Sequence, residues 1–141
     1  MNKKILVLVL AAVMLVAAVA AAGVVNGNRE PSDLWVLCVS GAAGAAEDFR
    51  EYIRTGSETA WWSAVAEYRV FMQAYHLIQD DASAEYTWCN SVYGFLLRGP
   101  ERAGDQAEEL ARAMELLAEN PEDVNAFEII SRVNNELLHG T

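Results

Sequence analysis

Apolar side chains recur at spacings of three and four residues along most of the chain after residue 31. That spacing places them on one face of an α-helix. Segment 34–39 alone could pass for a strand, but the sequence contains no second β-rich segment with which it could pair. Turn-forming residues interrupt the apolar pattern at 55–57, 80–83, 99–100 and 120–123. The sequence therefore predicts five helices, over about 33–54, 58–79, 84–98, 100–119 and 124–139.

Five amphipathic helices with short connections predict an all-α fold, in which residues 32–141 form an up-and-down antiparallel bundle of four to five helices. A helical-repeat array is the alternative architecture, although the sequence contains no visible second copy of a repeat unit. Gly41 and Ala45 lie on the apolar face of the first predicted helix. Small residues there would allow a neighbouring helix to approach closely.

The predicted helix ends carry recognisable capping residues. Segment 55–58 offers two alternative caps for the second helix, Ser57 alone or a capping box that begins at Thr55. Pro100 is placed at the first position of the fourth helix, where its missing N–H has no intrahelical partner to lose. Residues 120–123 end that helix and cap the last one.

Residues 1–25 have the order of a secretory signal peptide. Two lysines precede an uncharged run over 5–25, and the triplets 18–20 and 20–22 both fit the Ala-x-Ala cleavage pattern. The run is also long enough to cross the ~30 Å hydrocarbon core of a membrane as a helix. Its strongly apolar part covers only residues 5–16, which favours cleavage.

We therefore expect a signal peptide or an N-terminal membrane anchor over 1–25, a linker over 26–31 and a helical domain over 32–141. Both versions predict an extracytoplasmic domain, either secreted or anchored by the N-terminal helix. Membrane contact is expected only through residues 5–25, and only if that segment is not cleaved.

The chain is acidic, with 20 acidic against 10 basic residues and a net charge of −10. Both lysines lie in the first four residues, so the rest of the chain carries only arginine as its basic residue. Such a surface repels phosphate groups, and we expect no nucleic-acid partner. It fits a soluble protein or one that meets cationic partners. Glu108 and Arg112 have the i,i+4 spacing of an ion pair on an exposed helix face.

The sequence contains no catalytic, nucleotide-binding or metal-binding motif that we recognise, and it predicts no cofactor. Its histidines are His76 and His139. Glu136 and His139 form one Glu-x-x-His pair, whereas a di-iron bundle needs two such pairs and two further glutamates. His76 lies at the edge of an apolar stripe, four residues before Asp80. We interpret both histidines as structural.

Four aromatic residues are candidates for a binding surface: Trp61, Trp62, Trp88 and Tyr75. Trp61 and Trp62 are adjacent and therefore cannot both face the same core. Exposed tryptophan and tyrosine are typical of interfaces and of sites for cationic ligands. The alternative interpretation is that these side chains belong to the core, as most aromatics at helical spacing do.

Cys38 and Cys89 are the two cysteines of the chain. An even number of cysteines in an exported protein favours a disulfide. The Cys38–Cys89 bond would join the first and third predicted helices. Two buried free thiols are the alternative.

The sequence thus predicts an exported helical-bundle protein that acts as a binding or accessory module for an unidentified protein or small ligand, without enzymatic chemistry. One alternative is a membrane-anchored structural or regulatory subunit of an envelope complex. Another is an enzyme or metal protein that uses His76 or His139 without a sequence motif.

Overall fold

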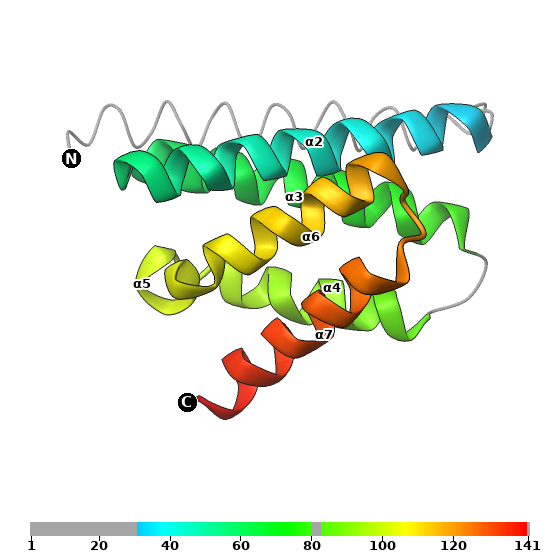
Figure 1. Cartoon of the computed structure of the whole chain (residues 1–141). Helices are drawn as coiled ribbons and strands as arrows, with labels where there is room; N and C mark the ends of the chain where they lie inside the picture. The colour runs from blue at the N-terminus through cyan, green and yellow to red at the C-terminus, as the bar shows by residue number, and fades with distance from the viewer. Residues whose placement is uncertain (1–30, 80–82, 141) are drawn as a thin grey trace.

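The computed structural model describes residues 31–79 and 83–140, and this part of the chain is helical without any strand (Figure 1). The predicted leader over 1–25, linker residues 26–30 and Asp80 lie outside the described residues. Five longer helices are joined by short connections, as predicted. The elements are α2 Pro31–Thr55, α3 Glu58–Ile78, α4 Ala84–Leu96, α5 Pro100–Ala103, the 3₁₀ turn η1 Gly104–Gln106, α6 Ala107–Glu119 and α7 Val124–His139.

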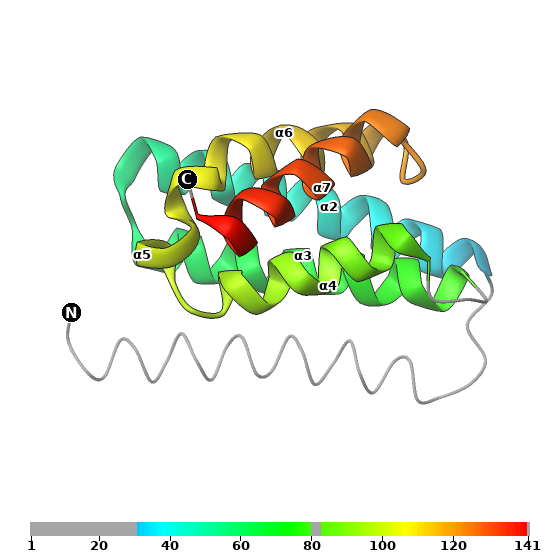
Figure 2. The same cartoon turned by 90° about the horizontal axis from the view of Figure 1, so that it is seen from below.

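Successive long helices run in opposite directions, and the two views agree on this (Figures 1 and 2). Helix α2 packs against α3 and α6, and α7 packs against α4 and α6. A further contact between α3 and α4 completes the arrangement. The five long helices therefore surround one apolar core, with α2 on the side away from the α4–α7 pair. None of the described helices is both long enough and apolar enough to cross a membrane.

The helix starts follow the capping residues. The Ser57 hydroxyl accepts a hydrogen bond from the Ala60 N–H at the start of α3, so the Ser57 alternative is the one observed. The Asp123 carboxylate accepts from the Ala126 N–H at 2.9 Å at the start of α7. Each cap satisfies one backbone donor that has no partner within its helix.

The fourth predicted helix is not continuous. It divides into the single turn α5, the 3₁₀ turn η1 and the longer helix α6. Ala103 leaves helical geometry at φ −128°, and Gly104 follows it. Gly104 passes so close to α2 that an added Cβ would lie 2.7 Å from the Tyr52 hydroxyl oxygen. Glycine has the lowest helix propensity after proline, so Gly104 weakens the helix next to the break, and it lies beside the Tyr52 hydroxyl.

The interface between α2 and α3 uses small residues, as the sequence predicts. Ala42 and Ala45 of α2 are fully buried. A Cβ added to Gly41 would lie 2.7 Å from the backbone nitrogen of Phe71 and 3.0 Å from the carbonyl oxygen of Glu67. The two backbones therefore approach more closely at Gly41 than any side chain would allow.

Two residues of the predicted apolar stripes are solvent-exposed. Ile53 is 44% exposed and Val124 is 69% exposed. Each lies in a terminal turn of its helix, where fewer neighbouring helices are available to cover a side chain. The apolar spacing predicts the buried face correctly along the helix centres. At these two helix ends it wrongly predicts burial for residues that are exposed.

The predicted disulfide is wrong, because both cysteines are free and buried. Cys38 of α2 faces α3, where its thiol donates to the Phe71 carbonyl at 3.9 Å. Cys89 belongs to α4, and its carbonyl accepts a hydrogen bond from the Tyr68 hydroxyl of α3 at 3.2 Å. Helix α3 therefore lies between the two cysteines, and α2 and α4 are not packed against each other as the predicted disulfide requires.

The predicted ion pair between Glu108 and Arg112 is not observed among the described residues. Helix α6 instead forms ion pairs with other helices. Glu108 contacts Arg50 of α2, and the same guanidinium donates to Glu115 at 2.8 Å. Arg50 thus joins α2 to α6. On the other side of α6, Glu109 pairs with Arg132 of α7.

Candidate functional site

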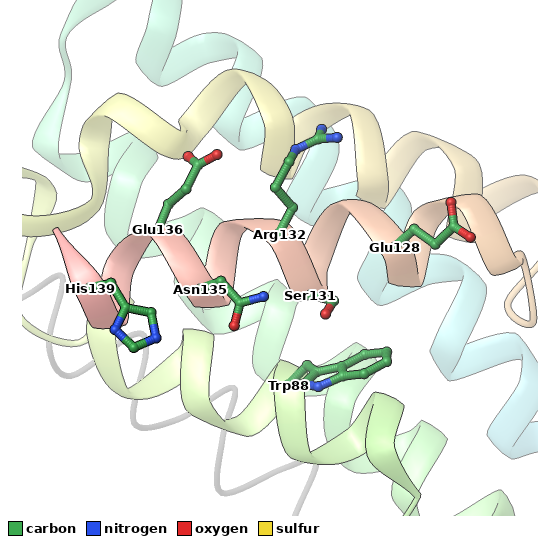
Figure 3. Close-up of a pocket in the computed structure, with 7 residues that line it drawn as sticks. All are labelled: Trp88, Glu128, Ser131, Arg132, Asn135, Glu136 and His139. Atoms are coloured by element: carbon green, nitrogen blue, oxygen red, sulfur yellow. The ribbon is translucent and has the colours of Figure 1, made fainter. Parts of the chain in front are cut away.

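An open groove of about 460 Å³ runs between α4 and α7 (Figure 3). Trp88 contributes the wall on the α4 side. Six residues of α7 form the other wall, all at spacings that keep them on its outer face. They are Glu128, Ser131, Arg132, Asn135, Glu136 and His139.

Packing on the opposite face of α7 fixes this polar stripe. Ile130, Val133 and Leu137 of α7 are buried in the core, which sets the rotation of the helix. On α4, Cys89 and Val92 are buried in the same way and leave the neighbouring Trp88 only partly covered. The groove is therefore a consequence of two amphipathic helices whose buried faces meet below it.

The side chains around the groove divide into two groups (Figure 3). Ser131 points toward the indole of Trp88, and Asn135 and His139 lie on that side of α7. Arg132 and Glu136 project from the other side of the helix. The first group presents a hydroxyl, an amide and an imidazole beside an aromatic ring, which is the mixture of apolar surface and placed polar groups typical of a ligand site.

The groove has an acidic rim. The guanidinium of Arg132 is paired with Glu109 of α6. Within the described ranges 31–79 and 83–140, neither Glu128 nor Glu136 belongs to an ion pair. Neither of these two carboxylates is therefore paired with a cation from this part of the chain, and Arg132, which lies between them in sequence, is already paired.

The last turn of α7 is held by α5. Arg102 donates from Nη2 to the carbonyl oxygen of Leu137 at 2.8 Å. A cation that binds the free carbonyls at a helix C-terminus also interacts favourably with the helix dipole. The same guanidinium lies 5.5 Å from the ring centre of Phe95. This contact supports the turn that carries Glu136 and His139.

The four predicted binding aromatics occupy different environments. Trp61 is fully buried and donates from Nε1 to the Leu96 carbonyl at 3.3 Å. Tyr75 is also in the core, with its ring centre 5.2 Å from that of Phe127. Trp62 is partly buried near Gly99. Of the four, Trp88 is the one that lines the groove.

The two histidines lie in separate places. His76 of α3 stacks on Tyr86 of α4, with ring centres 4.2 Å apart, and its Nδ1 has no hydrogen-bond partner among the described residues. His139 lines the groove on the side of α7 that faces Trp88, whereas Glu136 projects from the other side (Figure 3). No ion pair joins His139 to an acidic side chain in the described part of the chain. No group of three or more His, Cys, Asp and Glu side chains is placed to hold a metal ion within that same part.

Sequence reasoning did not select Glu128, Ser131, Arg132 or Asn135. In sequence they form the polar face of an amphipathic helix, and such a face is usually only solvated. Trp88 lies 40 to 51 residues before this stripe in sequence, and the packing of α4 against α7 brings them together. No family model, curated protein or solved structure matches the chain.

Proposed function

We propose that this protein is an exported binding module whose ligand site is the groove between α4 and α7. The observation that carries the proposal is the position of Trp88 on the wall of an open groove, opposite the polar stripe of α7. Trp61, Tyr68, Phe49 and Phe71 are buried in the core. Trp35 and Trp62 are partly buried like Trp88, but neither lines the groove.

A partly covered tryptophan in a concave site is a typical binding anchor. Its ring offers a large apolar area that loses little conformational entropy on binding, and tryptophan is enriched among residues that dominate binding energy. Ser131 and Asn135 lie across the groove and offer hydrogen-bonding groups that orient a ligand. This combination supports recognition.

The N-terminal sequence supports export. Lysines, a long uncharged run and two Ala-x-Ala triplets come in the order of a secretory signal. Cleavage would release the domain, and retention of residues 5–25 would tether it. Mass spectrometry of the protein isolated from its host separates the two, because cleavage after residue 20 or 22 removes the strongly apolar residues 5–16.

A photo-crosslinking experiment in the host tests the binding function. The full chain carries a benzoylphenylalanine at Asn135 in one variant and at Ala43 in the other. Ala43 is exposed on α2, whose packing partners are α3 and α6, so it is a matched surface control away from the groove. We expect a discrete adduct from the Asn135 variant and none of the same mass from the Ala43 variant. The proposal is wrong if both variants give the same products, or if neither gives any.

A further inference from the structure

We infer that the ligand of the groove is an arginine-bearing segment of a partner protein, with one guanidinium over the indole of Trp88 and a second one near Glu136 of α7. This inference rests on the proposed function and names the chemistry of its ligand.

Charge favours a cation in the groove. Glu128 and Glu136 line it and have no ion-pair partner in the described ranges, whereas Arg132 is paired with Glu109. The chain as a whole carries a net charge of −10. With Arg132 counted, the side chains that line the groove carry a net charge of −1, and an acidic concave surface concentrates cationic ligands.

The aromatic wall favours the same kind of ligand. A cation over the face of a ring is attracted by the ring quadrupole, and tryptophan is the strongest partner among the aromatic residues. Guanidinium is planar, stacks on an aromatic face and still donates in its own plane. The Ser131 hydroxyl and the Asn135 amide oxygen lie on the same side of α7 as Trp88 and can accept such hydrogen bonds.

The dimensions of the groove favour an extended segment over a single small cation. Its volume of about 460 Å³ exceeds that of one side chain. Glu128 and Glu136 are separated by two turns of α7, which corresponds to roughly 12 Å along the helix axis. In an extended chain, residues i and i+4 point to one side and are separated by about 13 Å. Two arginines at that spacing can therefore reach both parts of the groove, one over Trp88 and the other near Glu136.

Two capped peptides test this inference on the full chain in an uncharged detergent. One peptide has two arginines at positions i and i+4 in a glycine and serine background, and the other has citrulline at both positions. Citrulline keeps the shape of arginine and removes its charge. Binding is followed by NMR through the indole N–H of Trp88 and the backbone amides of Ser131 and Asn135.

We expect the arginine peptide to shift these signals and to bind about tenfold or more tightly than the citrulline peptide. The double substitution Glu128→Gln with Glu136→Gln should weaken binding of the arginine peptide by a similar factor. The matched control, Glu47→Gln with Glu119→Gln, removes the same charge from two exposed sites outside the groove and should change binding less than twofold.

Equal binding of the two peptides, with shifts at Trp88, would overturn the inference and leave the proposed binding function standing. An arginine peptide that shifts no groove signal would also overturn it, and the crosslinking experiment would decide the binding function separately. The peptide comparison uses the unmodified protein, so it remains decisive if a substitution perturbs folding.

Discussion

Gly41 of α2 lies against Phe71 of α3 so closely that a Cβ added to the glycine would come within 2.7 Å of the Phe71 nitrogen. The same Cβ would lie 3.0 Å from the Glu67 carbonyl oxygen. Both neighbours are backbone atoms, which cannot move aside as the end of a flexible side chain can. The separation of α2 and α3 is therefore set by the absence of a side chain at position 41.

We predict that Gly41→Ala destabilises the protein by about 1–3 kcal/mol, because the added methyl group forces the two helices apart. This net loss already includes the gain of about 1 kcal/mol that alanine has over glycine in a helix. Urea unfolding of both proteins, followed by circular dichroism, measures the difference.

Gly94→Ala is the matched control for that substitution. Gly94 lies within α4, and a Cβ there would meet no atom within 4 Å. The same chemical change should therefore stabilise the protein by about 0.5–1 kcal/mol. If Gly41→Ala and Gly94→Ala shifted stability equally, the close approach at Gly41 would not be setting the helix separation.

The cysteines give a second prediction. Burial raises the pKa of the Cys38 and Cys89 thiols to about 12, so few thiolates exist near neutral pH. Neither thiol should react with a chromogenic disulfide reagent while the protein is folded. Both should react once it is unfolded in guanidinium without a reductant. If the denatured, unreduced protein contained no reactive thiol, a disulfide between Cys38 and Cys89 would be present after all.

Glu67 gives a prediction on pH. Its pKa is raised above the ordinary range for a carboxyl group, chiefly by burial and further by the Asp48 carboxylate nearby. The folded state therefore holds this proton more tightly than the unfolded state, and stability is lost as pH rises through the raised pKa. Glu67→Gln should be more stable than the wild type above that pKa, and the gap should close at lower pH.

Glu115 supplies the control of opposite sign for that experiment. Its hydrogen bond with Arg50 lowers its pKa, so its contribution is present above the ordinary carboxyl range and is lost as pH falls through the lowered value. Glu115→Gln should be less stable than the wild type near neutral pH. Chemical denaturation across the acidic range compares both variants. If Glu67→Gln were less stable than the wild type at neutral pH, the raised pKa assigned to Glu67 would be wrong.

Leu110 tests the core. It is fully buried on α6, and Leu110→Ala should cost about 2–5 kcal/mol through lost burial and the cavity left behind. Leu138→Ala removes the same atoms from a side chain that is 53% exposed on α7 and should cost less than about 0.5 kcal/mol. Equal losses in calorimetry would mean that α6 does not face the core.

The helical part of the fold follows from local sequence. Ser57, Pro100 and Asp123 mark helix starts where the structure has them, because a cap depends on residues within one turn. The break at Ala103 and Gly104 was not predicted, although glycine is a weak helix former. The Tyr52 side chain beside Gly104 comes from a distant part of the sequence, so its place there could not be read from local residues.

Neighbour relations between helices are the part that sequence did not reveal. Cys38 and Cys89 both lie on apolar faces, but an apolar face does not say which helix covers it. The predicted disulfide needed α2 beside α4, whereas α3 lies between them. The groove was missed for the same reason, since Trp88 and Asn135 come together only through the packing of α4 on α7.

The most direct test of an exported protein with a ligand groove is labelling by a membrane-impermeant maleimide in cells stripped of any outer barrier. Asn135→Cys places a thiol in the groove and Ala43→Cys places one on the outer face of α2, while the native thiols stay buried. We predict that both introduced thiols react without lysis. We also predict that the Asn135→Cys thiol reacts several-fold more slowly in cells than in purified protein, whereas the Ala43→Cys thiol reacts at the same rate in both. Labelling that requires lysis would contradict export, and identical rate ratios for the two positions would contradict the binding groove.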